Sequence, residues 1–193
     1  GELADLAVDA EGRDTLDEFF ARLTPGDEVG DRNLHEPVLT GEGCDLRPAT
    51  AAEIRRLHPH VVAIKEASGS IGRAKELRAT TDLALIAGED ALIAEFMALG
   101  AVGVIGVVAN VAPREVAELC RVARPGGDPM RTAELVAFLD PLVRDLFLET
   151  NPAPMKAALA AMKLCREDVR LPLVTIEPQS REQLLASLHE AGL

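Results

Sequence analysis

The chain has 193 residues, of which 48% are hydrophobic and 27% charged, and its formal net charge is −12. These values are typical of a soluble globular protein. The acidic balance argues against nucleic acid as a partner, because phosphate binding requires a basic surface. The sequence contains no tyrosine and no tryptophan, so no phenol of this chain can transfer a proton.

The acidic excess is concentrated at the N-terminal end of the chain. Residues 1–45 contain 13 acidic and three basic residues, whereas residues 46–193 contain 19 acidic and 17 basic residues. An acidic stretch with few apolar residues is typical of a solvated segment. Only a short helix over residues 16–23 and a strand fragment over 37–39 are suggested there.

The three cysteines, Cys44, Cys120 and Cys165, are too widely spaced for a disulfide framework or a zinc ribbon. This pattern favours a reducing compartment, and we expect a cytoplasmic location. No apolar run reaches the roughly 18 residues of a membrane span, and no signal sequence opens the chain. We therefore expect no membrane association.

From residue 58 onward, β-branched runs alternate with amphipathic stretches, which is the pattern of βα units around a parallel sheet. We predict three strands, each followed by a helix. The strands are predicted over residues 60–67, 83–87 and 102–108, and the helices over 70–80, 91–99 and 113–124. This succession predicts an α/β fold.

A turn cluster at residues 125–127 ends the βα pattern. Apolar residues spaced three and four apart then predict three further helices, with an extended connector between the last two. These helices are predicted over residues 129–150, 154–165 and 180–191, and the connector over 170–174. Glu149 and Lys156 flank the break between the first two helices, and we expect them to pair.

Lys65 is the strongest candidate for a functional residue. Side chains alternate along a strand, so Lys65 shares a face with Val61 and Ala63, whereas Glu66 points to the opposite face. On a strand covered on both faces, an ammonium among apolar neighbours is costly, which favours the neutral and nucleophilic amine. Lys65 also lies at the C-terminal end of its strand, where barrels carry their chemistry. The alternative is a lysine that reaches solvent at a strand end.

Six collinear motifs connect this sequence with a known family. They are GCDLRPAT at 43–50, VVAIKEASG at 61–69, AGEDAL at 87–92, LGAVGVIGVVANVAP at 99–113, LFLETNPAPMKAAL at 146–159 and VRLPLV at 169–174. From Gly43 to Leu193 the chain resembles the dihydrodipicolinate synthase / N-acetylneuraminate lyase family. Within this family, the motif sequences are most similar to those of dihydrodipicolinate synthase. These proteins are Schiff-base lyases and aldolases that act on pyruvate and other 2-oxo acids.

The resemblance implies a partial (β/α)8 TIM barrel over residues 43–126, followed by a small helical domain over residues 127–193. It places Lys65 on the Schiff-base lysine, Ile105 on a residue that lines the pyruvate pocket, and Gly88 on a glycine at the pocket rim. Barrel packing remains the alternative for Ile105, and a strand-ending turn for Gly88.

The resemblance also implies an activity and a set of partners. The activity is an aldol-type condensation of pyruvate with an aldehyde, in lysine biosynthesis. It needs no cofactor and no metal, and assembly into a homo-oligomer is expected.

The sequence departs from the family pattern upstream of Gly43. The family has a tyrosine that relays protons and an arginine that binds the second substrate, and residues 36–39 and Gly41 stand at these places. We therefore expect residues 1–42 to be a divergent segment that arose by truncation, fusion or a frame disturbance. The alternative function is a catalytically inactive paralogue that serves as an interaction subunit or has no function.

His58 and His60 form an H-x-H pattern that could suggest a metal site. They precede the strand that ends in Lys65, and this places them at the opposite end of the barrel from the chemistry. We predict a solvated turn at this position. His35 and His189 have no acidic or cysteine partners at a suitable spacing, and we expect both at the surface.

Overall fold

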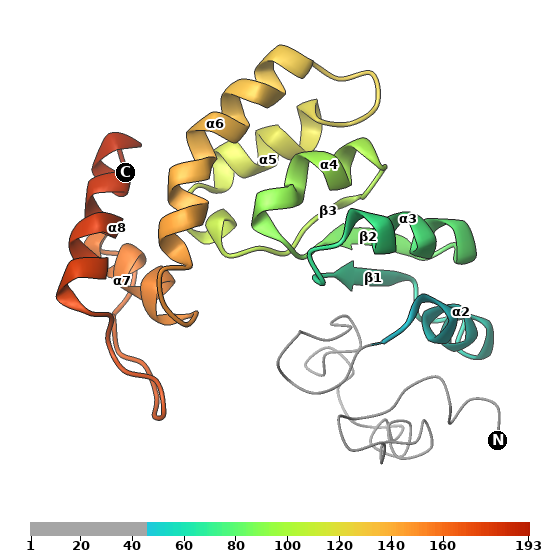
Figure 1. Ribbon diagram of the computed structural model, residues 1–193, viewed down its shortest axis with the longest axis horizontal. Coiled ribbons are helices and arrows are strands. Elements are labelled where there is room, and N and C mark those ends of the chain that lie inside the picture. The colour runs from blue at the N-terminus through green and yellow to red at the C-terminus, as the bar shows by residue number, and fades with distance from the viewer. Residues whose placement is uncertain (1–45) are drawn as a thin grey trace. The chain divides into compact units, whose positions relative to one another are not determined.

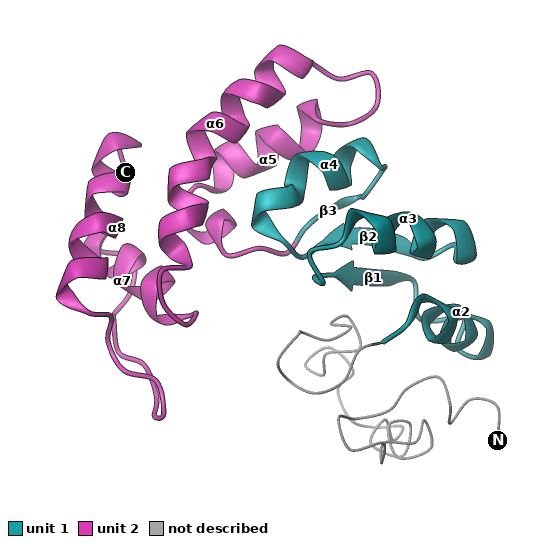
Figure 2. Cartoon of the chain, in the orientation of Figure 1, with its two compact units in different colours: residues 1–104 teal, residues 105–193 magenta. Residues whose placement is uncertain are grey.

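The computed structural model describes residues 46–193 (Figure 1). The helix predicted over residues 16–23, the strand fragment over 37–39 and His35 lie outside this range. The chain divides into two compact units, residues 1–104 and 105–193, coloured separately in Figure 2. This division does not coincide with the predicted boundaries at residues 42 and 126, and that three-part division stays a prediction.

The described part of the first unit is built on a three-stranded parallel sheet in the order β1–β2–β3. The strands are β1 (Ala63–Glu66), β2 (Ala84–Ala87) and β3 (Gly103–Val104). In this register Lys65 lies opposite Ile86, which in turn lies opposite Gly103. The predicted α/β fold is therefore confirmed.

Helices connect the strands, as parallel pairing requires. Helix α3 (Ile71–Thr80) joins β1 to β2, and α4 (Ile93–Ala98), preceded by the short 3₁₀ helix η2 (Asp90–Leu92), joins β2 to β3. Helix α2 (Pro48–Leu57) precedes β1. The Ser70 hydroxyl caps α3 by accepting a hydrogen bond from the Arg73 amide at 3.2 Å. Figure 1 shows α3 and α4 over the same face of the sheet, as expected for right-handed crossovers.

Burial alternates along the strands of the first unit. Ile64, Leu85 and Ala87 are buried, and the helices that follow the strands contribute Leu77 and Phe96 to the same core. The residues between them on the strands are only half-buried. Among the described residues of this unit, the packed core therefore lies on the helix side of the sheet.

Two details of the structure differ from the sequence prediction. The strand predicted over residues 102–108 is wrong beyond Val104, because a 3₁₀ helix, η3 (Val108–Asn110), follows. The Asn110 side-chain amide donates to the Val107 carbonyl at 3.0 Å, and such local bonds compete with a strand. Helix α2 was not predicted, although Pro48 at its first turn is a helix-start signal.

The second unit contains four α-helices in its described residues, and each of these α-helices was predicted. They are α5 (Pro113–Val122), α6 (Pro129–Leu146), α7 (Ala153–Ala161) and α8 (Pro178–Glu190). Their buried side chains include Leu119, Leu142, Leu146 and Leu184. This unit therefore has a hydrophobic core of its own.

A hydrogen-bond network joins α6 to α8. Asp145 is buried, and its carboxylate accepts hydrogen bonds from the Gln183 amide at 2.8 Å and from the Ser187 hydroxyl. The exposed Arg144 guanidinium pairs with the same carboxylate at 2.7 Å. These bonds compensate the cost of removing a charge from water.

The expected pair between Glu149 and Lys156 is not formed. Glu149 instead accepts a hydrogen bond from the Glu177 amide at 2.8 Å, and the Lys156 ammonium donates to the Asp168 carbonyl. Both side chains therefore fasten the segment between α7 and α8, which local sequence spacing does not reveal.

Candidate active site

Lys65 lies on the half-buried face of β1, one residue before the strand ends. Its neighbours on that face are Ala63 in the same strand and Ile86 in β2, which lies opposite Lys65 in the register. The apolar character of these neighbours is confirmed. The expectation of cover on both faces is wrong for the described part of the first unit, because Ala63, Lys65 and Ile86 all remain partly exposed.

Glu66 points to the opposite face of the strand, as predicted. Its side chain is 1% exposed, and one carboxylate oxygen lies 3.1 Å from the Arg73 Nε in the first turn of α3. The other oxygen accepts a hydrogen bond from the Ser68 amide at 2.7 Å. Glu66 therefore fixes the turn that follows Lys65, a positioning role that the sequence analysis did not assign.

Gly88 lies beside Lys65. The Gly88 amide donates to the Glu66 carbonyl at 2.8 Å, which continues the pairing of β1 and β2 beyond the strands. A Cβ at Gly88 would lie 2.6 Å from the Ala67 Cβ, 2.8 Å from the Glu66 carbonyl oxygen and 3.0 Å from the Lys65 Cε. Only a residue without a side chain fits at this position.

Ile105 follows β3 directly and is the first residue of the second unit. Its side chain is 51% exposed, so it is not a buried packing residue. The structure thus brings two of the three predicted site residues, Lys65 and Gly88, into contact distance within one unit. The binding role of Ile105 stays a prediction.

His58 and His60 lie in and next to the turn that follows α2, and their rings are 5.6 Å apart in an edge-to-face arrangement. Within residues 46–193, no group of three or more histidine, cysteine or acidic side chains is arranged to hold a metal ion. None of the helices formed by these residues has the length and apolar character needed to cross a membrane.

These sequence and structural features can be compared with known proteins. A profile of the Dihydrodipicolinate synthetase family matches residues 35–191, starting upstream of Gly43. The 4-hydroxy-tetrahydrodipicolinate synthase of Methylococcus capsulatus is 43% identical over 153 residues, which is 78% of this chain and 52% of the relative. The protein of the same name from Thermomicrobium roseum is 42% identical over 162 residues, which is 81% of this chain and 53% of the relative.

Solved structures show the same relationship. The 4-hydroxy-tetrahydrodipicolinate synthase of Methylacidiphilum fumariolicum SolV superimposes with a TM-score of 0.73 at 37% identity, covering 77% of this chain and 50% of that protein. The chloride-inhibited dihydrodipicolinate synthase of Acinetobacter baumannii, complexed with pyruvate, gives 0.71 at 38% identity, covering 77% and 51%.

The chain spans about half the length of these relatives. The parallel βα units followed by helices are part of a (β/α)8 barrel and its helical C-terminal region, as the sequence predicted. Since the family profile covers more than half of the residues, this chain belongs to the dihydrodipicolinate synthetase family.

Proposed function

We propose that this chain carries the Schiff-base chemistry of its family, with Lys65 as the nucleophile and pyruvate as the substrate. The observation that carries the proposal is the placement of Lys65 at the carboxyl end of a parallel strand, on the partly exposed face, beside Gly88. Catalytic residues of (β/α) barrels lie at this end of the strands.

The proposed step forms one carbon–nitrogen bond. The Lys65 side-chain nitrogen attacks the keto carbon of pyruvate, and loss of water from the resulting carbinolamine gives an imine. Loss of a proton from the methyl carbon then converts the imine into an enamine, which is the carbon nucleophile for an aldehyde. This is the aldol-type condensation that the relatives' name, 4-hydroxy-tetrahydrodipicolinate synthase, suggests, and its place would be lysine biosynthesis.

Two neighbours of Lys65 support this role. Gly88 leaves space for the lysine methylene groups, because a Cβ at this position would lie 3.0 Å from the Lys65 Cε. Glu66 is held by Arg73 on the other face. We extend the proposal to Ile105 as a residue that lines the pyruvate site, to assembly of several copies and to a cytoplasmic location.

A second candidate function is an inactive family member that acts as an interaction subunit. The absence of tyrosine from this chain favours it, since the family relays protons through a tyrosine. In this case Lys65 would be present in the chain but would not react with pyruvate. The two candidates differ in whether Lys65 forms an imine, which can be trapped.

The test is reduction with borohydride in the presence of millimolar pyruvate, followed by peptide mass spectrometry. We expect a reduced adduct on Lys65, its loss in Lys65→Ala and its retention in Lys75→Ala, which removes an exposed lysine of α3. Absence of an adduct, or equal labelling of Lys65 and Lys75, would overturn the enzyme proposal. An adduct without consumption of pyruvate and aldehyde would limit the proposal to the Schiff-base step.

A further inference from the structure

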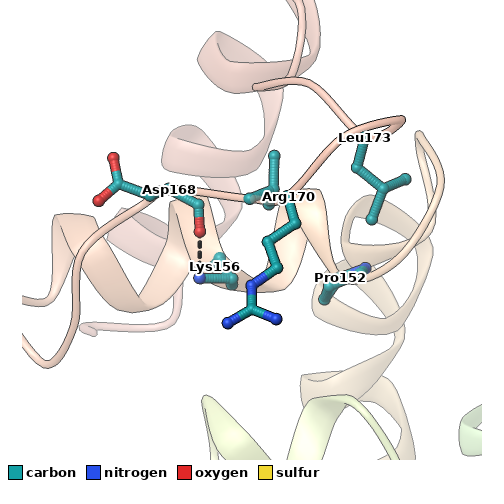
Figure 3. Close-up of a pocket in the computed structure, with 6 residues that line it drawn as sticks. Pro152, Lys156, Asp168, Arg170 and Leu173 are labelled. Carbon is teal, nitrogen blue, oxygen red and sulfur yellow. Dashed lines mark hydrogen bonds between the residues drawn. The ribbon is translucent and has the colours of Figure 1, made fainter.

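The second unit contains a pocket that neither the family resemblance nor the proposed function uses. Its volume is about 450 Å³, within the usual range of small-molecule sites. It lies between the start of α7 and the segment that leads to α8, and Figure 3 shows its lining residues. These are Pro152, Lys156, Asp168, Val169, Arg170 and Leu173.

Two cationic side chains line this pocket, and neither has a carboxylate partner among residues 46–193. The Lys156 ammonium donates to the Asp168 main-chain carbonyl, as the dashed line in Figure 3 marks. This carbonyl is neutral, so it does not balance the lysine charge. Arg170 is exposed and pairs with no acidic side chain within residues 46–193.

The acidic residues nearest in sequence pair with other arginines. The Asp168 carboxylate lies 2.6 Å from the Arg166 Nε, and Glu167 pairs with Arg181. Two positive charges, Lys156 and Arg170, are therefore left over at the pocket. An ammonium has three donors and a guanidinium five, so most donors of this pair remain available to an anion.

Apart from these two cations and Asp168, whose carboxylate pairs with Arg166, the lining of the pocket is apolar. Pro152, Val169 and Leu173 supply hydrocarbon surface, which an inorganic anion cannot use. A ligand that satisfies both parts has one carboxylate for the two cations and a short aliphatic body for the apolar wall.

We propose that this pocket binds a small aliphatic carboxylate, held by Arg170 and Lys156 at its charged end and by Pro152, Val169 and Leu173 along its hydrocarbon body. The site does not depend on Schiff-base formation at Lys65. A negative result in the borohydride experiment therefore leaves this proposal standing.

The experiment measures how fast phenylglyoxal modifies Arg170 in the full chain, by peptide mass spectrometry. The probe is isocaproate, and the matched ligands are the neutral isocaproamide and inorganic phosphate. Arg114, an exposed residue of α5, is the internal control. We expect isocaproate to slow modification of Arg170 several-fold in a saturable manner and to leave Arg114 unchanged.

A variant then tests the second cation. In Lys156→Met, the isocaproate concentration that gives half-maximal protection of Arg170 should rise about tenfold, as expected for the loss of one charge-assisted hydrogen bond. Lys156→Arg keeps the charge and should preserve the protection.

Three results would overturn the proposal. They are an unchanged rate at Arg170, equal protection by isocaproamide, and equal protection by phosphate. Each is obtained with the unaltered chain, so the decision does not depend on the folding of a variant.

Discussion

Gly88 has no Cβ, and this allows the carboxyl ends of β1 and β2 to approach each other closely. A Cβ at Gly88 would meet the Ala67 Cβ, the Glu66 carbonyl oxygen and the Lys65 Cε. Two of these three neighbours are Cβ or backbone atoms, which cannot move without displacing the strand. The fit at Gly88 and the position of Lys65 are therefore linked.

Gly88→Ala should destabilise the fold and reduce trapping of pyruvate at Lys65. The new Cβ would lie 2.6 Å from the Ala67 Cβ, and relief of such overpacking costs about 1–3 kcal/mol. Urea unfolding followed by circular dichroism measures the loss of stability, and the borohydride adduct measures the effect on Lys65.

Gly103→Ala in β3 is the matched control, because a Cβ at Gly103 meets nothing within 4 Å. We expect it to change stability far less than Gly88→Ala. Equal effects of the two substitutions would show that the close approach at Gly88 does not control this part of the sheet.

The proximity of Lys65 and Gly88 follows from sequence features that could be recognised. Each of these two residues lies at the carboxyl end of a strand, and the two strands are parallel neighbours. The carboxyl ends of parallel strands meet at one edge of the sheet. The Glu66–Arg73 pair could not be predicted in the same way, because the direction of the Arg73 side chain depends on how α3 packs. A pattern of apolar residues does not specify such polar contacts.

Between elements, the buried carboxylate of Asp145 joins α6 to α8. Burial alone would raise the pKa of Asp145, but hydrogen bonds from Arg144, Ser187 and Gln183 outweigh it and hold the pKa below its ordinary value. A carboxyl with a lowered pKa stabilises the folded state above its unfolded-state pKa of about 3.9. This contribution is lost as the pH falls through the folded-state pKa.

Asp145→Asn should therefore destabilise the fold by about 1–3 kcal/mol at neutral pH, because it weakens hydrogen bonds to a charged group. The difference in the free energy of unfolding between this variant and the unaltered chain should become smaller below about pH 4, where the carboxylate becomes protonated in the unfolded chain. Urea unfolding at a series of pH values measures both effects.

Asp140→Asn removes an exposed acid from the same helix and should change stability by less than about 0.5 kcal/mol. If Asp145→Asn were as stable as Asp140→Asn at neutral pH, the network between α6 and α8 would not contribute to stability.

At the scale of elements, helices were predicted better than strand ends. Regular apolar spacing identifies α5 and α8, since buried apolar residues lie three apart in α5 and four apart in α8. The end of β3 was missed because its apolar run continues through Val107 and Val108, while the backbone already turns into η3. Apolar character alone does not distinguish a strand from a buried turn.

The chain as a whole contains two compact units, and the second has its own core. Leu142 is fully buried within it, so Leu142→Ala should cost about 2–5 kcal/mol. Hydrogen exchange measured by mass spectrometry should show lost protection in α5, α6 and α8, whereas β1 and β2 keep theirs.

Val136→Ala is the control for this prediction. Val136 lies on the same helix and is 40% exposed, so its truncation should leave the protection of both units nearly unchanged. Equal loss of protection in both units after Leu142→Ala would show that the chain unfolds as one cooperative body.

The family and the fold could be predicted from the motifs, because they are collinear over most of the described residues. The motifs do not specify the two compact units, because these depend on which segments share a core, and the three-part division based on the motifs stays a prediction. Residues 105–126 were assigned to the barrel by their sequence, yet they belong to the same compact unit as the C-terminal helices. Contacts between elements, such as the ion pair between Glu118 in α5 and Arg131 in α6 at 2.8 Å, join these residues to the C-terminal helices.

The partly exposed face of the sheet also affects which strand positions can accept substitutions during evolution. On β2, Leu85 and Ala87 are buried, whereas Ala84 and Ile86 are only half-buried. Neutral substitutions should therefore accumulate at every second strand position. Lys65 lies on the tolerant face, where folding alone makes little demand for a lysine. Retention of this amine through long divergence would consequently measure selection on its chemistry, separately from selection on the fold.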